Sequence, residues 1–146
     1  MDISLGMAVE LPGGVYNVVG VTRYSASALD CRLWQLDSGE GQTALLAGVG
    51  ETFYTPVLDA VDALPDDPQV TVNDVSYALR GEGEARAEKS AVAAPGESRG
   101  RSDFWLARYR FYTATGKVAL FTADKDGLHR LLGEELAPGL VQVYKA

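Results

Sequence analysis

Short runs of β-branched and aromatic residues alternate with glycine-containing turns along the first half of the chain. Residues 15–21 follow a Gly-Gly pair and have the composition of a strand that is entered through a turn. Two apolar runs, 33–36 and 42–46, flank a short turn that contains two glycines, and this arrangement predicts a β-hairpin. Residues 51–55 predict one further strand. The first half is therefore expected to consist of strands.

The stretch after these runs changes character. Pro56 is expected to end the preceding strand, because proline cannot donate a hydrogen bond to a sheet. Residues 57–64 carry apolar residues at helical spacing, but prolines enclose them on both sides, so one or two helical turns are the most they can form. Residues 56–68 are therefore predicted to connect two halves.

The second half repeats the pattern of the first. Tyr77 falls on Tyr16 with an offset of 61, and Tyr109 falls on Trp34 with an offset of 75. The difference between the offsets corresponds to residues 90–102, which are mostly small, polar and turn-forming and predict a long inserted loop. The predicted fold class is all-β: two pseudo-repeated small antiparallel sheets, each barrel-like or sandwich-like, with short helical turns at most. The two repeats are expected at 1–68 and 69–146.

One hairpin of the second half is specified in more detail. Residues 81–88 alternate small with charged side chains, so a strand would carry its small residues on one face and its charges on the other. Residues 104–112 place aromatic side chains at alternate positions in the same way. An antiparallel pair of these strands would oppose the small residues to Trp105, Tyr109 and Phe111, and would oppose Glu82, Glu84 and Glu88 to Arg108 and Arg110 as a salt-bridge ladder.

Composition and charge narrow the classes of function. The chain has 146 residues, 47% hydrophobic and 23% charged, as expected of one globular domain or two very small ones. Its net charge of −7 argues against broad binding of nucleic acid or anionic membranes. The charge is uneven, with −8 in residues 1–73 and +1 in residues 74–146. Such asymmetry can orient a protein partner or a second copy of the chain.

The amino terminus lacks the basic residues and the apolar run of a secretory signal, and no apolar stretch approaches the about 20 residues of a membrane-spanning helix. A cytoplasmic location without membrane insertion is expected. Cys31 and His129 are the one cysteine and the one histidine, which excludes an internal disulfide and a Cys/His zinc cluster within one chain. No cofactor and no metal are expected.

A set of short, mostly structural motifs runs along nearly the whole chain. The motifs are Gly6, residues 15–20, 33–36 and 75–79, Gly96-Glu97 and residues 132–134. Together they resemble a bacterial family known only as a domain of unknown function, number four-one-seven-eight in that series. The resemblance implies a small cytoplasmic accessory protein, often encoded beside or fused to spermidine-synthase-like proteins and near membrane-stress genes. It implies no catalytic residues.

Four features invite a chemical interpretation. Residues 124–127, Asp-Lys-Asp-Gly, resemble the start of a calcium loop, but the remaining ligands are absent and a polar hairpin turn is favoured. His129 has no designated catalytic partner. Cys31 lies beside Arg32, which would favour its thiolate, but a small core residue is the favoured interpretation. The pair Glu82 and Glu84 has a spacing compatible with acid/base catalysis, and the salt-bridge ladder is again favoured.

These observations favour a non-enzymatic accessory module that binds a protein partner or itself. The alternative is a binding protein for a small molecule, a polyamine or a lipid, held in a cavity. An enzyme of unidentified activity ranks third. The predicted contact surface consists of Arg99, Arg101, Arg108 and Arg110, and the cavity of the alternative would be lined by Tyr16, Trp34, Tyr77 and Trp105.

Overall fold

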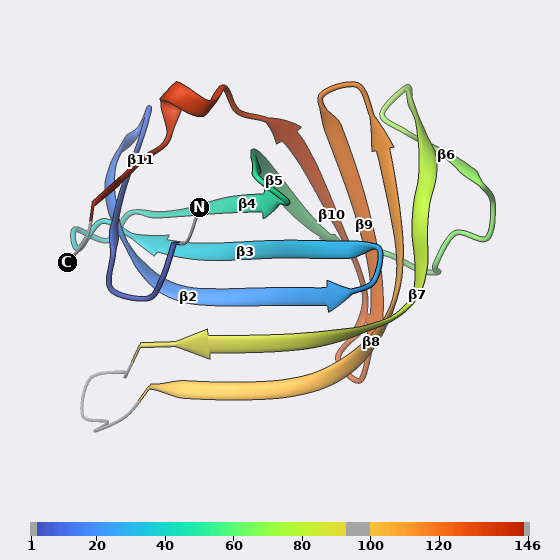
Figure 1. Cartoon of the computed structure of the whole chain (residues 1–146), viewed down its shortest axis with the longest axis horizontal. Coiled ribbons are helices and arrows are strands. Elements are labelled where there is room, and N and C mark those ends of the chain that lie inside the picture. Colours follow the sequence, from blue (N-terminus) through green and yellow to red (C-terminus); the bar gives the residue numbers. More distant parts are fainter. Residues whose placement is uncertain (1–2, 93–99, 145–146) are drawn as a thin grey trace.

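Eleven strands and one 3-10 turn make up the described chain, and every strand pairing is antiparallel (Figure 1). The structure is a computed structural model that describes residues 3–92 and 100–144. The all-β prediction is confirmed. The elements are β1 (Ala8–Leu11), β2 (Gly14–Ala26), β3 (Leu29–Asp37), β4 (Thr43–Val49), β5 (Thr52–Ala60), β6 (Gln69–Val72), β7 (Val75–Ala91), β8 (Arg101–Ala114), β9 (Lys117–Asp124), β10 (Gly127–Glu135), η1 (Pro138–Leu140) and β11 (Gln142–Tyr144).

Hydrogen bonds join all the strands in one sheet. The order is β11-β1-β2-β3-β4-β5-β10-β9-β8-β7-β6, and an additional pairing of β2 with β7 closes the strands from β2 to β7 into a ring. The expectation of two small sheets is therefore wrong. Pairing across the halves, β5 with β10 and β2 with β7, makes one sheet of segments 1–68 and 69–146, because each half has long strand edges that its own strands leave unpaired.

The predicted first hairpin is confirmed, and the predicted connector begins later than expected. β3 and β4 pair from Asp37 opposite Thr43 onward. The strand at β5 does not end at Pro56 and residues 57–60 form no helical turn, since β5 continues to Ala60 opposite β10. Pro56 is tolerated because β4 pairs only with residues 52–54, so the missing N–H faces no strand on that side. The connector is therefore residues 61–68.

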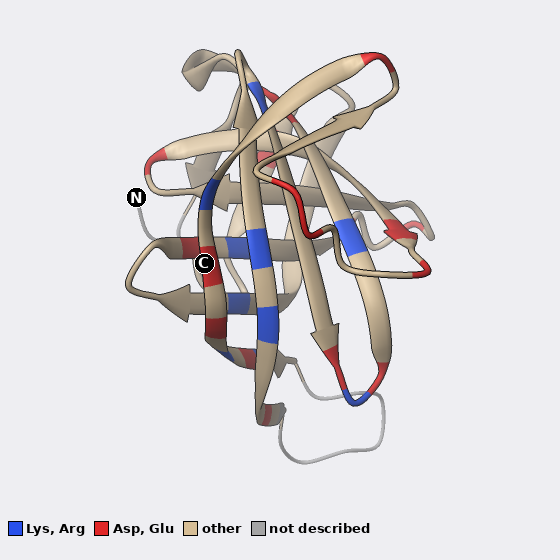
Figure 2. Ribbon diagram, turned by 90° about the vertical axis from the view of Figure 1, so that its right-hand side faces the viewer, with Lys and Arg blue, Asp and Glu red and all other residues tan. Residues whose placement is uncertain are grey.

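The detailed hairpin of the second half is confirmed by the pairing of β7 with β8. Gly83 stands opposite Tyr109 and Ala87 opposite Trp105, so small residues oppose large rings. On the other face Glu82 stands opposite Arg110 and Glu84 opposite Arg108, as predicted, but Glu88 stands opposite Phe104 and has no arginine across from it. The strands extend further into the predicted loop than expected, since Ala91 pairs with Arg101. Figure 2 shows acidic bands beside basic bands where these two long strands run next to each other.

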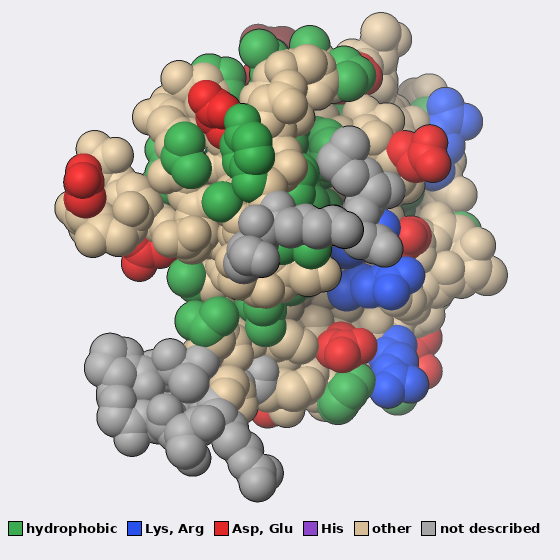
Figure 3. Space-filling view, turned by 60° about the vertical axis from the view of Figure 1, so that its left-hand side comes forward, with side chains coloured by type: hydrophobic (Ala, Val, Ile, Leu, Met, Phe, Trp, Pro, Cys, Tyr) green, Lys and Arg blue, Asp and Glu red, His purple; other side chains and the backbone are tan. Residues whose placement is uncertain are grey.

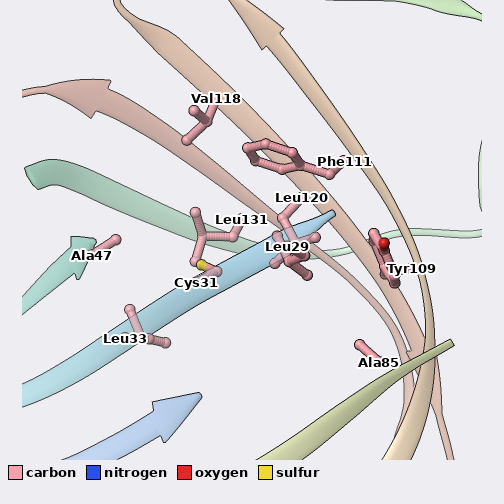
Figure 4. Close-up of a cluster of buried hydrophobic side chains, with 10 residues drawn as sticks. All are labelled: Leu29, Cys31, Leu33, Ala47, Ala85, Tyr109, Phe111, Val118, Leu120 and Leu131. Carbon is pink, nitrogen blue, oxygen red and sulfur yellow. The ribbon is translucent and has the colours of Figure 1, made fainter. Parts of the chain in front are cut away.

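The ring encloses the main hydrophobic core. Side chains from β3, β4, β7, β8, β9 and β10 meet in its interior (Figure 4). Cys31 and Ala85 are almost wholly buried there, at 0% and 1% exposure. Tyr24 and Tyr54 pack against this core from β2 and β5. The interior is therefore filled by side chains over most of its length. Its buried members are Leu29, Cys31, Leu33, Ala47, Ala85, Tyr109, Phe111, Val118, Leu120 and Leu131.

Two smaller clusters lie apart from the main core, one in each half. The first-half cluster includes Tyr16 and Trp34 and is completed by Ile3 and by Val141 near the carboxyl end. The second-half cluster includes Tyr77 and Tyr112 and is completed by side chains of the connector. Each cluster is covered by a segment outside the ring strands. The amino-terminal segment covers the first-half cluster, and the connector covers the second-half cluster.

The predicted correspondence of Tyr109 with Trp34 is wrong by one position. The ladder of β2 and β3 shifts register between Val18 and Gly20, and that of β7 and β8 shifts between Leu79 and Gly81, at the predicted offset of 61. Counting from these shifts, Trp34 corresponds to Arg110 instead. The sequence comparison gives an offset of 75 between β3 and β8 where the ladders give 76. It aligns ring with ring, and aromatic residues occupy both faces of β8, so rings alone do not fix the alignment. That the chain arose by duplication stays a prediction.

Candidate functional site

A pocket opens at one end of the ring interior and is the best candidate for a site. It has a volume of about 320 Å³, near the lower limit of the about 300–1,000 Å³ of typical small-molecule pockets. We call it the interior pocket. Buried leucines of β3, β9 and β10 form its apolar wall, and a few polar groups stand among them. Its lining is Tyr24, Leu33, Leu58, Asp59, Ala60, Leu120, Thr122, His129, Arg130 and Leu131.

The hairpin of β9 and β10 sets the polar side of the interior pocket. Residues 124–127 form the tight turn that was favoured over a calcium loop, and the Asp126 backbone N–H donates to the Asp124 carboxylate at 2.8 Å. This turn fixes the register that places His129 opposite Thr122. β5 in turn places Ala60 opposite His129. Three neighbouring strands therefore bring one imidazole, one hydroxyl and one small side chain to the same opening.

Tyr24 supplies a phenolic hydroxyl from β2. Burial raises its pKa to about 12, the negative charge of Asp124 adds to this shift, and a hydrogen bond with the Thr122 side chain opposes it. Tyr24 is therefore a neutral hydroxyl at physiological pH. The same charge of Asp124 makes the electrostatic potential around this hydroxyl negative, which disfavours an anionic group there.

An ion pair flanks the opening. Arg130 on β10 and Asp59 on β5 stand opposite each other, and the Arg130 Nη2 lies 3.2 Å from the Asp59 Oδ2. The Nε atom of Arg130 is buried and has no hydrogen-bond partner. Because Asp59 neutralises the guanidinium, the flank carries no net formal charge toward the interior pocket.

Cys31 is a core side chain, as favoured from the sequence. It is wholly buried in the ring interior. Burial raises the pKa of its thiol to about 12, the charge of Asp30 contributes to the increase, and Arg32 opposes it. The thiolate needed for nucleophilic or redox chemistry is thus strongly disfavoured.

The arginines predicted to form a contact surface are not equivalent. Arg99 lies outside the described residues, and Arg101 begins β8. Arg108 stands opposite Glu84. Arg110 uses all three guanidinium nitrogens within the molecule: Nη1 contacts the Glu82 carboxylate at 2.8 Å, Nη2 donates to the Asp67 carbonyl oxygen at 3.0 Å and Nε donates to the Tyr112 hydroxyl at 2.9 Å. Arg110 therefore anchors the connector to β8.

Arg108 and Arg110 border a polar groove between the connector and the hairpin of β7 and β8. The groove has a volume of about 630 Å³, and Asp62, Asp66 and Glu84 are among its lining residues. Acidic and basic groups thus face one another across it, so it is not a basic patch. The side of the molecule away from this groove, drawn in Figure 3, also carries acidic side chains beside basic ones.

The four aromatic residues predicted to line a cavity do not meet. Tyr16 and Trp34 share the first-half cluster, and the Trp34 indole N–H donates to the Ile3 carbonyl oxygen at 3.0 Å. Tyr77 belongs to the second-half cluster. The indole N–H of Trp105 donates to the Asp124 carboxylate at 3.0 Å. The four aromatic residues therefore stabilise three separate parts of the fold and line no common cavity.

The structure also locates the other residues that the sequence suggested for a chemical role. Glu82 pairs with Arg110, which matches the favoured ladder. His129 is exposed at the opening of the interior pocket and is the one candidate that the structure places at the site. Within the described ranges, no group of His, Cys, Asp and Glu side chains has the arrangement of a metal site, and no helix is long and apolar enough to cross a membrane.

The sequence pattern does not identify two polar residues of the interior pocket, Tyr24 and Thr122. Tyr24 and Thr122 come from different halves, and the pairing of β2 with β7 and of β8 with β9 brings them together. One available signal was the Asp-Lys-Asp-Gly turn, which implies that His129 stands opposite Thr122. Placing Tyr24 beside them requires knowledge of how the ring closes.

Comparison of the chain with protein-family models, with curated protein sequences and with solved structures found no match. The resemblance to the domain of unknown function, and the gene neighbours that it implies, therefore stay predictions. The interior pocket must be interpreted from its own chemistry.

Proposed function

We propose that this protein is a non-enzymatic binding protein whose interior pocket takes a small apolar molecule with one neutral hydrogen-bonding end. The observation that carries the proposal is the composition of the interior pocket: an apolar wall, three polar groups from Tyr24, Thr122 and His129, and one ion pair, Arg130 with Asp59, whose charges neutralise each other. Pockets of this kind bind by burying apolar surface, and their few polar groups orient the ligand.

The apolar wall favours a lipid-like molecule over a polyamine. Leu33, Leu120 and Leu131 are 9%, 2% and 6% exposed, so a ligand reaching them leaves water almost completely. A polyamine would lose the hydration of its ammonium groups there. Asp59 is the carboxylate in the lining, and it already pairs with Arg130. A buried polycation would therefore lack a free counter-charge.

The polar end of the ligand is expected to be uncharged. Tyr24 and Thr122 offer hydroxyl groups, and His129 stands beside Thr122. The negative charge of Asp124 acts on Tyr24 and would repel a carboxylate head group. A hydroxyl or amide end can accept or donate hydrogen bonds to these groups without opposing that charge.

Thermal unfolding with three probes tests this function. We expect 1-octanol to raise Tm saturably, octanoate to do so more weakly, and spermidine to have no saturable effect. A probe at about 100 times its Kd stabilises the folded state by about 2.7 kcal/mol, which is several degrees for a domain of this size. The absence of a saturable response to 1-octanol, or a stronger response to spermidine, would overturn the proposal.

Two matched substitutions on β5 locate the binding. Ala60→Phe adds a ring at the opening beside His129 and should abolish the response to 1-octanol. Val57→Phe adds the same ring to the same strand at an exposed position on the opposite face, outside the interior pocket, and should leave the response unchanged. Equal responses in the two variants would show that the probe binds elsewhere.

The interaction module favoured from the sequence is a second candidate, supported by a different surface. Exposed apolar side chains at Phe104 and Leu106 lie on β8, close to the predicted arginines. Arg110 is engaged within the molecule, so the apolar part of this strand is a better contact surface than its basic part.

A further inference from the structure

The first part of β8 is an open strand edge. β9 pairs with β8 only from Arg108 onward, and within the described residues the strand paired with 101–107 is β7. The turn at 124–127 follows the pairing of Arg108 with Ala123, so the segment that a further strand can reach is 101–106. In Figure 1 this segment runs along the border of the sheet. We call it the β8 edge.

Every second residue of the β8 edge turns its backbone groups away from the sheet. β8 joins β9 through a two-residue turn, and the residues that close such a hairpin, Ala114 and Lys117, bond to each other. Even-numbered residues of β8 therefore point their N–H and C=O groups toward the side of β9, because bonded and non-bonded positions alternate along an antiparallel strand. Within the β8 edge these residues are Ser102, Phe104 and Leu106, which have no partner in β9. They form a template for another strand.

The β8 edge lacks the features that usually prevent pairing. Natural edges are commonly protected by lysine, proline or a bulge, but this segment contains no lysine or proline and its register with β7 is regular. Its outward face carries Phe104 and Leu106, which are 54% and 62% exposed. Its one acidic residue, Asp103, stands opposite Lys89 on the other face. A strand that pairs here therefore also covers apolar surface.

The β8 edge is held in an extended conformation before any partner arrives. The Trp105 indole donates to Asp124 at 3.0 Å, and the Arg86 guanidinium lies 4.8 Å from the centre of the Phe104 ring. Both contacts fix side chains of the edge against its own sheet. Ordering the edge therefore costs little when a further strand adds to it.

Positive charges lie beside the exposed apolar pair. The Arg86 guanidinium covers the Phe104 ring, and Arg108 follows the β8 edge on the same face. Within the described residues neither guanidinium forms an ion pair, and the acids opposite this part of β8, Glu84 and Glu88, lie on β7, one strand further from the border. An incoming strand thus meets an apolar surface flanked by cations, which is complementary to apolar residues flanked by carboxylates.

We propose that the β8 edge binds an extended segment of a partner protein, with apolar side chains beside Phe104 and Leu106 and an acidic side chain at each end. Recognition of this kind adds a strand to a sheet: backbone hydrogen bonds supply affinity and alternate side chains supply specificity. The segment ends or turns away before Arg108, where β9 occupies the edge.

A second copy of the chain fits the β8 edge poorly. Two copies related by a two-fold axis perpendicular to the sheet place one residue opposite itself. An axis at Asp103 opposes two carboxylates, and an axis at Phe104 leaves Leu106 opposite a serine. An axis at Trp105 requires pairing at Arg108, which β9 already holds. The occupant is therefore a different chain.

Fluorescence anisotropy with two labelled hexapeptides tests the chemistry of the partner. Glu-Ile-Thr-Ile-Thr-Glu should bind saturably. Lys-Ile-Thr-Ile-Thr-Lys has the same apolar residues and the opposite charge, and should bind about tenfold more weakly at low salt. High salt should reduce the difference. No saturable binding of the acidic peptide, or equal affinities of the two peptides at low salt, would overturn the proposal.

Methylated backbones test the addition of a strand. With the isoleucine side chains on the face of Phe104 and Leu106, the isoleucine amides face β8 and the threonine amides face solvent. N-methylation of the second isoleucine should weaken binding of the acidic peptide by about tenfold, whereas N-methylation of the threonine after it should have little effect. Equal effects of the two methyl groups would show that the peptide does not pair with the edge.

A matched pair of substitutions locates the binding. Leu106→Ser removes apolar surface from the β8 edge and should weaken binding of the acidic peptide by about tenfold, with an unchanged circular-dichroism spectrum. Val57→Ser, at another exposed apolar residue on β5, should bind as the wild type does. Equal binding by the two variants would overturn the proposal. So would a wild-type dimer in sedimentation equilibrium that Leu106→Ser dissociates, because a second copy would then be the occupant.

Binding at the β8 edge rests on the second candidate function and not on the interior pocket. Ala60→Phe, which fills the opening of the interior pocket, should leave peptide binding unchanged. Leu106→Ser should leave the response to 1-octanol unchanged. Each proposal can therefore fail alone.

Discussion

The two halves of the ring use the same backbone position for opposite purposes. One step beyond the register shift of the first half, Val21 stands opposite Trp34, and at the corresponding step of the second half Glu82 stands opposite Arg110. Trp34 is 1% exposed, whereas the side chain of Arg110 is 15% exposed and forms an ion pair. An apolar cross-strand pair is thus matched by a charged one on the same ladder.

The segments that cover these pairs follow the same course. The Val18 N–H donates to the Met7 carbonyl oxygen at 2.9 Å, and the Leu79 N–H donates to the Pro68 carbonyl oxygen at 2.8 Å. Trp34 then bonds to the amino-terminal segment through the Ile3 carbonyl oxygen, as Arg110 bonds to the connector.

The two clusters differ in how many segments cover them, and this difference explains why one holds an indole ring and the other lies beside an ion pair. The first half also receives Val141 and β11 from the carboxyl end, so its cluster excludes water and can hold an indole ring. The second half has the connector alone, and a polar groove remains beside it. A charged pair suits a position that water still reaches, because a partly exposed ion pair keeps much of its hydration.

The largest expected effect follows from removing the apolar member of this comparison. Trp34→Ala should lower the free energy of unfolding by about 3–5 kcal/mol, since it leaves a cavity in a dry cluster. Urea denaturation measures the loss. The matched change Trp105→Ala, at a half-buried indole, should cost clearly less. Similar losses for the two tryptophans would contradict the contrast between a dry and a wet cover.

Gly48 tests the packing against the Trp34 ring. A Cβ atom at Gly48 would lie 2.8 Å from the Trp34 Cη2 atom, so Gly48→Ala should destabilise the fold by about 1–3 kcal/mol. The corresponding residue of the second half is Ala123, opposite Arg108, where no indole needs the space. In the Trp34→Ala background, Gly48→Ala should cost almost nothing. Additive losses in this double-mutant cycle, measured by urea denaturation, would show that the ring does not require the glycine.

These contrasts also show which parts of the fold the sequence could specify. Local alternation predicted the faces of β7 and β8, because small and charged residues alternate with a period of two between residues 81 and 88. It did not predict the strand through Pro56, since the tolerance of that proline depends on β4 ending its pairing early. The hairpin of β6 and β7 was missed, although Asn73 and Asp74 supply the positive φ angles of a two-residue turn.

The candidate site was less predictable than the fold. His129 could be named because it is the one histidine, but its neighbours depend on strand pairings between distant parts of the chain. Tyr24 reaches the opening only because β2 pairs with both β3 and β7. Non-local closure of this kind leaves no periodic signal in the sequence.

The interior gives a third contrast, which depends on pH. Tyr24 stands opposite Cys31 in the first half, and the corresponding pair in the second half is Ala85 opposite Ala107. The pKa values of Tyr24 and Cys31 are both raised to about 12, from 10.0 and 9.0. The folded state holds these protons more tightly than the unfolded state. Their contribution to stability is therefore full below pH 9 and is lost as pH rises toward 12.

Each group should reduce the free energy of unfolding by up to about 1.4 kcal/mol per pH unit within this interval. Urea denaturation of the wild type and of Tyr24→Phe between pH 8 and pH 11 measures the slope. The variant should show a shallower decline above pH 10. Parallel curves would mean that the Tyr24 hydroxyl titrates alike in the folded and unfolded states.

The anchor of the connector gives a smaller effect. The Tyr112 hydroxyl donates to the Asp67 carbonyl oxygen at 2.7 Å, and Arg110 donates to the same oxygen. Tyr112→Phe should therefore cost only about 0.5–1.5 kcal/mol, because the carbonyl keeps one donor. Tyr144→Phe removes an exposed hydrogen bond to Glu10 and should cost less in the same urea titration. A loss above that of Gly48→Ala would mean that the connector depends on this hydroxyl alone.

The smallest effect is expected at the charged pair itself. The Glu82 side chain is 56% exposed, so its contact with Arg110 at 2.8 Å is largely screened by solvent. Glu82→Gln should lower the free energy of unfolding by less than about 1 kcal/mol, and the difference should decrease further in high salt. Glu134, which pairs with Lys117 across β9 and β10 and whose side chain is 76% exposed, is a suitable control position. A loss as large as that of Trp34→Ala would mean that the second half depends on its ion pair as the first depends on its indole, and would remove the distinction between the two covers.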